Sequence, residues 1–115
     1  MTYREMGLVD QAVDSFRIAE QDPRLSARAF EMTGRCFTDQ QRFAEAAVEF
    51  ERALGQPNLD PMGAAELRYQ LALALESAGD PASALREYEA VAEVLSGYED
   101  VDARIASLRG ATGAA

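Results

Sequence analysis

The sequence contains no histidine, so the candidates for catalysis in this chain are carboxylates and a single thiol. The absence of histidine removes the commonest general base, the commonest zinc ligand and the usual activator of a nucleophile. Cys36 is the one cysteine, so neither an intrachain disulfide nor a thiolate cluster for zinc can form. Arg35 beside it would lower the pKa of the thiol, but Cys36 lies next to expected packing positions. We predict a small, partly buried side chain.

Two groups of acidic residues invite a metal-binding or acid–base interpretation. Their spacing, with alanines between, predicts exposed and solvated helix faces for both groups: Glu87, Glu89 and Glu93, and Glu99, Asp100 and Asp102. No EF-hand loop with its central glycine is present, and the glycine-rich segment at Gly110 follows no strand. The sequence therefore predicts no metal, no cofactor and no enzymatic activity.

The net charge limits the classes of molecule that the chain can bind. Twenty acidic residues stand against eleven basic ones, all of them arginine, and the net charge is −9. Such a chain repels phosphate backbones, so we expect no nucleic-acid partner. The longest apolar run, residues 71–75, is far shorter than the roughly 20 residues that span a bilayer. Because the first residues do not resemble a signal peptide either, we expect a soluble, cytoplasmic protein with no direct membrane insertion.

The chain length of 115 residues allows one domain with a modest core. Alanine, leucine, glutamate and arginine dominate, which favours helices. No alternating run rich in valine, isoleucine or threonine is present, so no sheet is expected.

An amphipathic pattern at residues 43–54 recurs along the chain. Its apolar positions follow the spacing of one helical stripe: Phe43, Ala46, Ala47, Phe50, Ala53 and Leu54. Ala12, Phe16 and Ala19 precede Ala46, Phe50 and Ala53 by 34 residues each. A further copy follows after 38 residues, where Ala84 and Tyr88 correspond to Ala46 and Phe50. The four extra residues fall in the turn-rich segment 55–63.

The first half of the middle copy carries a family motif. Phe30, Thr33, Gly34 and Phe37 read F-x2-T-G-x2-F, which resembles the W-x2-L-G-x2-Y pattern of tetratricopeptide repeats. In the last copy Leu71, Ala72 and Leu75 hold the corresponding places, with departures at Thr33, Arg68 and Val91. The resemblance covers about residues 1–95. It implies an all-α α-solenoid of antiparallel helix hairpins in a right-handed superhelix, with about 2.5 repeats plus a C-terminal capping helix.

Turn residues set the expected boundaries. Asp22-Pro23, Asp60-Pro61 and Asp80-Pro81 each offer an N-cap carboxylate before a proline at the first helical position, and Gly55, Gly97 and Gly110 offer left-handed helix ends. We predict helices at 10–20, 24–38, 42–54, 61–78, 81–95 and 99–109. The single domain, 1–109, then contains a partial repeat 1–22, repeats 23–58 and 61–96, and a capping helix 98–109. Residues 110–115 would form a flexible tail.

The ends of the array depart from the repeat. Residues 1–6 are expected to be only the tail of a front helix, which leaves an apolar face uncovered. Either the chain is part of a longer solenoid, or a second copy covers the face in a homodimer. At the other end Val101, Ile105 and Leu108 form the apolar stripe of the cap.

The resemblance also implies where a partner binds, because front helices line the concave groove of such arrays. The residues carried over as partner-binding are Arg4, Arg28, Glu31, Met32, Arg35, Thr38, Tyr69, Gln70 and Leu73. Glu5, Asp39, Glu66 and Glu76 fall on the same faces. Two alternatives stay open: Arg35 can instead pair with Glu31 four residues earlier, and Tyr69 can instead pack between repeats. The groove lacks the lysine and asparagine of repeats that clamp chaperone C-termini, so a co-chaperone is not expected.

We therefore expect a non-catalytic protein–protein interaction module that binds a partner peptide or helix in the groove. Arginine without lysine, abundant alanine and the segment from Tyr98 to Ile105 resemble bacterial scaffolds, of which this would be the C-terminal part. The alternative is a structural or self-assembly role with no groove ligand.

Overall fold

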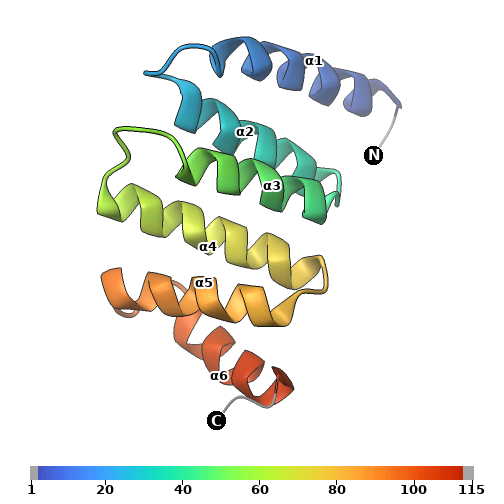
Figure 1. The fold of residues 1–115 in the computed structure, drawn as a ribbon. Coiled ribbons are helices and arrows are strands. Elements are labelled where there is room, and N and C mark those ends of the chain that lie inside the picture. Colours follow the sequence, from blue (N-terminus) through green and yellow to red (C-terminus); the bar gives the residue numbers. More distant parts are fainter. Residues whose placement is uncertain (1–2, 113–115) are drawn as a thin grey trace. The chain divides into compact units, whose positions relative to one another are not determined.

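The computed structural model describes residues 3–112, and this part of the chain is all-helical with no strand. Its helices are α1 (Tyr3–Ala19), α2 (Ser26–Asp39), α3 (Phe43–Leu54), α4 (Pro61–Ser77), α5 (Pro81–Val94) and α6 (Val101–Thr112) (Figure 1). The chain divides into two compact units, Met1–Asn58 and Leu59–Ala115, which we describe separately as the N-terminal and C-terminal units. None of the helices in the described part is long and apolar enough to cross a membrane. The predicted fold class is confirmed.

The N-terminal unit is built on the antiparallel hairpin of α2 and α3 (Figure 1). The predicted stripe of α3 is its buried face: Ala46, Ala47, Phe50 and Ala53 are all buried. Gly34 of α2 permits the close approach, because a Cβ atom there would lie only 2.7 Å from the Phe50 ring. The glycine of the repeat motif is thus explained by the aromatic residue that packs against it. Helix α1 packs against α2.

The turn between α2 and α3 has the same geometry as the turn between α4 and α5. Gln41 has φ 60° and Gly79 has φ 87°, both in the left-handed region. The next amide in each turn bonds back into the helix, from Arg42 N–H to the Phe37 carbonyl (2.8 Å) and from Asp80 N–H to the Leu75 carbonyl (2.9 Å). Both helices therefore end in a Schellman motif, although only the second has glycine at the left-handed position.

Helix α1 corrects the prediction for the first repeat. We expected a front-helix tail at residues 1–6 and a second helix at 10–20, but one helix runs from Tyr3 to Ala19. Gly7, which falls between the two predicted segments, lies inside this helix. Leu8 and Val9 follow it directly. Helices α4 and α5, by contrast, each begin with a capping aspartate followed by a proline. A glycine alone does not end a helix when the next residues can continue it.

Other predicted helix ends were partly wrong. Asp60 and Asp80 cap their helices as predicted, accepting hydrogen bonds from the amides of Gly63 (2.6 Å) and Ser83 (3.2 Å). Asp22 does not, because its carboxylate is taken by Arg24, and α2 begins only at Ser26 without a side-chain cap.

Three glycines were expected at left-handed helix ends, and two of them differ from the prediction. Gly97 agrees with it, with φ 72°. Gly55 instead has φ −81°, and α6 continues through Gly110 to Thr112, past the predicted end at 109. The rest of the predicted tail, residues 113–115, lies outside the described part.

The C-terminal unit packs α4 against α5 and α5 against α6 (Figure 1). The capping stripe of Val101, Ile105 and Leu108 is buried in one apolar cluster with Tyr88 and Val91 of α5. The cap predicted from this stripe is therefore present. It closes the apolar surface of the last hairpin while its acidic residues, such as Asp102, stay exposed.

Candidate functional site

The outward face of α2 carries a row of three charged residues. Glu31 accepts one hydrogen bond from Arg28 (Nη1 to Oε1, 3.1 Å) and one from Arg35 (Nη2 to Oε2, 2.9 Å). The local pairing that we had considered for Arg35 is therefore present. Both arginines remain accessible nonetheless, since the Arg28 side chain is 66% exposed and that of Arg35 is 49% exposed. The shared carboxylate fixes both guanidinium groups on a rigid helix.

The other predicted residues of this helix are less available. Met32 is half-buried, and the Thr38 hydroxyl donates to the carbonyl of Gly34 (3.0 Å). Arg4, predicted to extend the same surface from the first unit, has its side chain outside the described residues.

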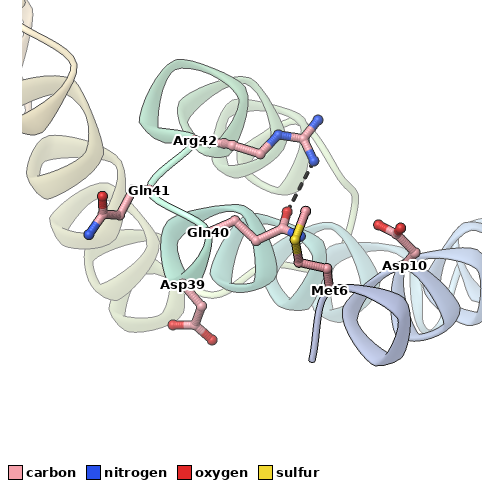
Figure 2. A pocket seen from close by; sticks show the side chains of 6 residues that line it. All are labelled: Met6, Asp10, Asp39, Gln40, Gln41 and Arg42. Carbon is pink, nitrogen blue, oxygen red and sulfur yellow. Dashed lines mark hydrogen bonds between the residues drawn. The ribbon is translucent and has the colours of Figure 1, made fainter. Parts of the chain in front are cut away.

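An open hollow of about 590 Å³ lies at the C-terminal end of α2. It is lined by Met6 and Asp10 of α1, by Asp39 of α2, and by Gln40, Gln41 and Arg42 of the turn (Figure 2). In that view Met6 lies beside Gln40, with Asp10 and Asp39 on its two sides. Asp39 continues the face of α2, one turn beyond Arg35. The hollow and the charged row are therefore parts of one surface, which we call the α2 surface.

Arg42 is held firmly at the edge of this hollow. Its guanidinium donates to both carboxylate oxygens of Glu45 and to Gln40 Oε1 (3.0 Å), and it lies 4.4 Å from the centre of the Phe37 ring. The hydrogen bond with Glu45 is the main reason why the pKa of Arg42 is raised, and the charge of Asp10 adds to it. Arg42 is thus neutralised locally and cannot swing into the hollow without losing these contacts.

Sequence reasoning placed Asp39 on a front helix but missed the hollow. Met6 was assigned to a helix tail and Asp10 to the start of another helix. In the structure they lie one turn apart on the same helix, which brings both side chains to the hollow. Their spacing of four residues was the available signal, but it is informative only if the helix is continuous.

The predicted residues of α4 are engaged by their own unit. The Tyr69 hydroxyl donates a 2.7 Å hydrogen bond to Asp100 Oδ1, and the ring meets Tyr98 edge-on with centroids 5.3 Å apart. Leu73 packs against the apolar cluster of the cap, and Gln70 is half-buried. The packing alternative for Tyr69 is therefore present, within the last hairpin and its cap. A role for Tyr69, Gln70 and Leu73 in partner binding stays a prediction.

A polar network surrounds this aromatic group. Glu76 accepts hydrogen bonds from the Tyr88 hydroxyl (2.9 Å) and from Arg104 Nη1 (3.0 Å), and Arg104 Nε donates to Asp100 (2.7 Å). Burial, followed by the hydrogen bond to Asp100, raises the pKa of Tyr69 to about 12. These contacts join α4, α5 and α6, so the network fastens the cap.

The thiol and the carboxylates considered for catalysis or metal binding lie apart. The Cys36 thiol is half-buried, and burial, with a smaller contribution from the charge of Asp39, raises its pKa. The lowering expected from Arg35 is not found, and the thiol stays protonated near neutral pH. Glu87 pairs with Arg68 (3.0 Å). Within the described residues no three cysteine or carboxylate side chains are arranged to hold a metal ion.

Two helical hairpins that share one turn geometry, the second closed by a cap, define a helical-hairpin repeat protein. A family model described as tetratricopeptide repeat matches residues 1–61 of the 115. The chain therefore belongs to the tetratricopeptide repeat family, as its sequence motifs predicted. A comparison with curated proteins gave no match.

Proposed function

We propose that this chain is a non-catalytic protein-interaction module that binds a partner peptide or helix on the front face of its repeats. Tetratricopeptide repeats generally mediate protein–protein interactions. The observation that carries the proposal is the α2 surface, where Glu31 holds Arg28 and Arg35 on a rigid helix with their guanidinium groups accessible. Prepositioned guanidinium groups bind with little loss of side-chain entropy.

The α2 surface is a better candidate for this role than the corresponding face of α4. Tyr69 and Leu73, the apolar anchors predicted there, are already packed against residues of their own unit. A partner would have to displace those contacts. Arg28 and Arg35, by contrast, can donate hydrogen bonds to a partner carboxylate while they remain paired with Glu31. We therefore place recognition mainly on α2.

The alternative is a structural or self-assembly role, which exposed apolar side chains on α1 favour. Ile18 is 72% exposed and Leu8 59%. Such side chains are natural contacts for a further repeat or for a homodimer. We also propose that the chain comes from a bacterial scaffold protein, and its arginine-only, alanine-rich composition supports a bacterial origin.

Capture of partners from a native lysate tests the proposed function. The variant Arg28→Glu with Arg35→Glu should lose partners that the unaltered protein retains, because it reverses both accessible charges. Arg24→Glu with Arg86→Glu is the matched control, since these arginines are exposed and contact only Asp22 and Ser83. A variant that folds and keeps every partner would rule out binding through α2. Sedimentation tests the self-assembly form of the alternative, which requires a dimer or a larger assembly of this chain.

A further inference from the structure

The hollow at the end of α2 contains two carboxylates that the rest of the described chain leaves unpaired. Neither Asp10 nor Asp39 makes a hydrogen bond or ion pair with a described residue. Asp10 interacts with Arg42 only through its charge at longer range. Because Arg42 is compensated by Glu45, the hollow retains an uncompensated negative charge from its two aspartates.

The described cations of the protein do not compensate this charge. Of the ten arginines whose side chains are described, nine form ion pairs: Arg17, Arg24, Arg28, Arg35, Arg42, Arg52, Arg68, Arg104 and Arg109. The tenth, Arg86, lies in the C-terminal unit and donates to Ser83. Since lysine and histidine are absent from the sequence, no described side chain of this protein compensates the charge of the hollow; the side chain of Arg4 lies outside the described residues.

We propose that the hollow receives an arginine or lysine side chain from a segment of the bound partner. Met6, which is 42% exposed, offers an apolar surface to the aliphatic part of such a side chain. Asp10 and Asp39, which line the hollow on either side of Met6 in the view of Figure 2, supply the negative charge that attracts its cationic end. The inference rests on the proposed function, because Asp39 continues the α2 surface, and it adds the chemistry of the partner.

A second copy of this chain is the wrong occupant on charge. Each copy carries a net charge of −9. Two such chains repel one another, which disfavours a second copy at this acidic hollow. The occupant is therefore a partner segment with an exposed basic side chain.

Binding of defined peptides tests this inference. The probes are fluorescein-labelled helical peptides with one apolar stripe that differ only in carrying arginine, glutamine or glutamate at one exposed position. Titration at low ionic strength, followed by anisotropy, should give the arginine peptide about fivefold higher affinity than the glutamine peptide. Raising the ionic strength from about 0.01 M to about 0.15 M should reduce the preference. Amide chemical shifts should move at Met6, Asp10 and residues 39–42.

Matched variants then locate the effect. Asp10→Asn with Asp39→Asn should abolish the preference for arginine. Glu51→Gln with Glu93→Gln changes the net charge by the same amount at exposed sites elsewhere and should keep it. An equal affinity for the three peptides, or a preference that survives the aspartate variant, overturns the inference while the proposed function stands. If the free protein dimerises and the aspartate variant changes that dimerisation, the occupant of the hollow is a second copy and the inference is overturned. Failure to bind any of the peptides overturns it too, and the lysate capture then decides the proposed function independently.

Discussion

The hydroxyl of Tyr69 donates a 2.7 Å hydrogen bond to Asp100, a residue 31 positions later at the start of the cap. Its ring simultaneously meets Tyr98, so one side chain of α4 holds both the aromatic and the acidic residue that lead into α6. Asp100 is oriented in turn by Arg104, which also reaches Glu76 of α4. The cap is therefore held by a polar network on one side and by its apolar stripe on the other.

Tyr69→Phe should weaken the C-terminal unit modestly. The substitution removes the hydrogen bond to Asp100 but keeps the ring that packs on Tyr98. A hydrogen bond to an exposed carboxylate contributes about 1 kcal/mol, and urea unfolding should show a loss of that size. Ser96→Ala, at an exposed position outside the helices, is a control expected to change little. A Tyr69→Phe protein as stable as the unaltered one would mean that packing alone holds the cap.

The same tyrosine predicts a loss of stability at alkaline pH. The pKa of Tyr69 is raised to about 12 in the folded protein, against about 10 for an unperturbed tyrosine. The folded state therefore keeps its proton over a range where the unfolded state loses it. The resulting stabilisation is complete below about pH 10 and disappears as the pH rises towards 12. Denaturant unfolding between pH 9 and 12 should show this decline, and Tyr69→Phe should make it shallower. An identical pH profile in the two proteins would contradict the assignment.

Gly34→Ala should destabilise the N-terminal hairpin although alanine is the better helix former. Alanine gains about 1 kcal/mol in helix propensity over glycine. Its Cβ atom, however, would lie 2.7 Å from the Phe50 ring, and the ring is buried with little room to move. Overpacking of this kind costs typically 1–3 kcal/mol, so the net result should be a lower melting temperature. Gly7→Ala, where nothing lies within 4 Å, should instead raise it, which makes the pair a test of the α2–α3 register.

Arg17→Leu should destabilise the same unit by leaving a buried carboxylate poorly compensated. Glu49 of α3 is 3% exposed and accepts hydrogen bonds from both terminal nitrogens of Arg17 in α1. Removing one partner of a buried pair costs about 3–5 kcal/mol, but Arg17 is 36% exposed, so about 2 kcal/mol is expected. Arg52→Leu is the control, since its contact with Glu49 is longer, at 3.5 Å. Equal losses from the two variants in urea unfolding would refute the special role of Arg17.

The parts that sequence reasoning predicted are those encoded in short-range spacing. The buried positions of α3 follow a helical stripe, and the pairing of Arg35 with Glu31 follows from their spacing of four residues. The junction between Tyr69 and Asp100 joins residues far apart in the chain, and no local pattern indicates it. The hollow depends on the continuity of α1 through Gly7 and on a left-handed residue in the next turn. Glutamine does not signal that conformation.

Gln41→Gly should stabilise the N-terminal unit, because Gln41 has φ 60° in the turn where the next repeat has Gly79. A residue with a Cβ atom loses roughly 1–2 kcal/mol in the left-handed region relative to the right-handed one, whereas glycine adopts it readily. Glycine is also more flexible in the unfolded chain, which offsets part of the gain. We expect a net gain of about 0.5–1 kcal/mol in urea unfolding. Gly79→Gln should show the opposite change in the C-terminal unit, since it places the same strain in the equivalent turn. If both variants shift stability in the same direction, the equivalence of the two turns is wrong.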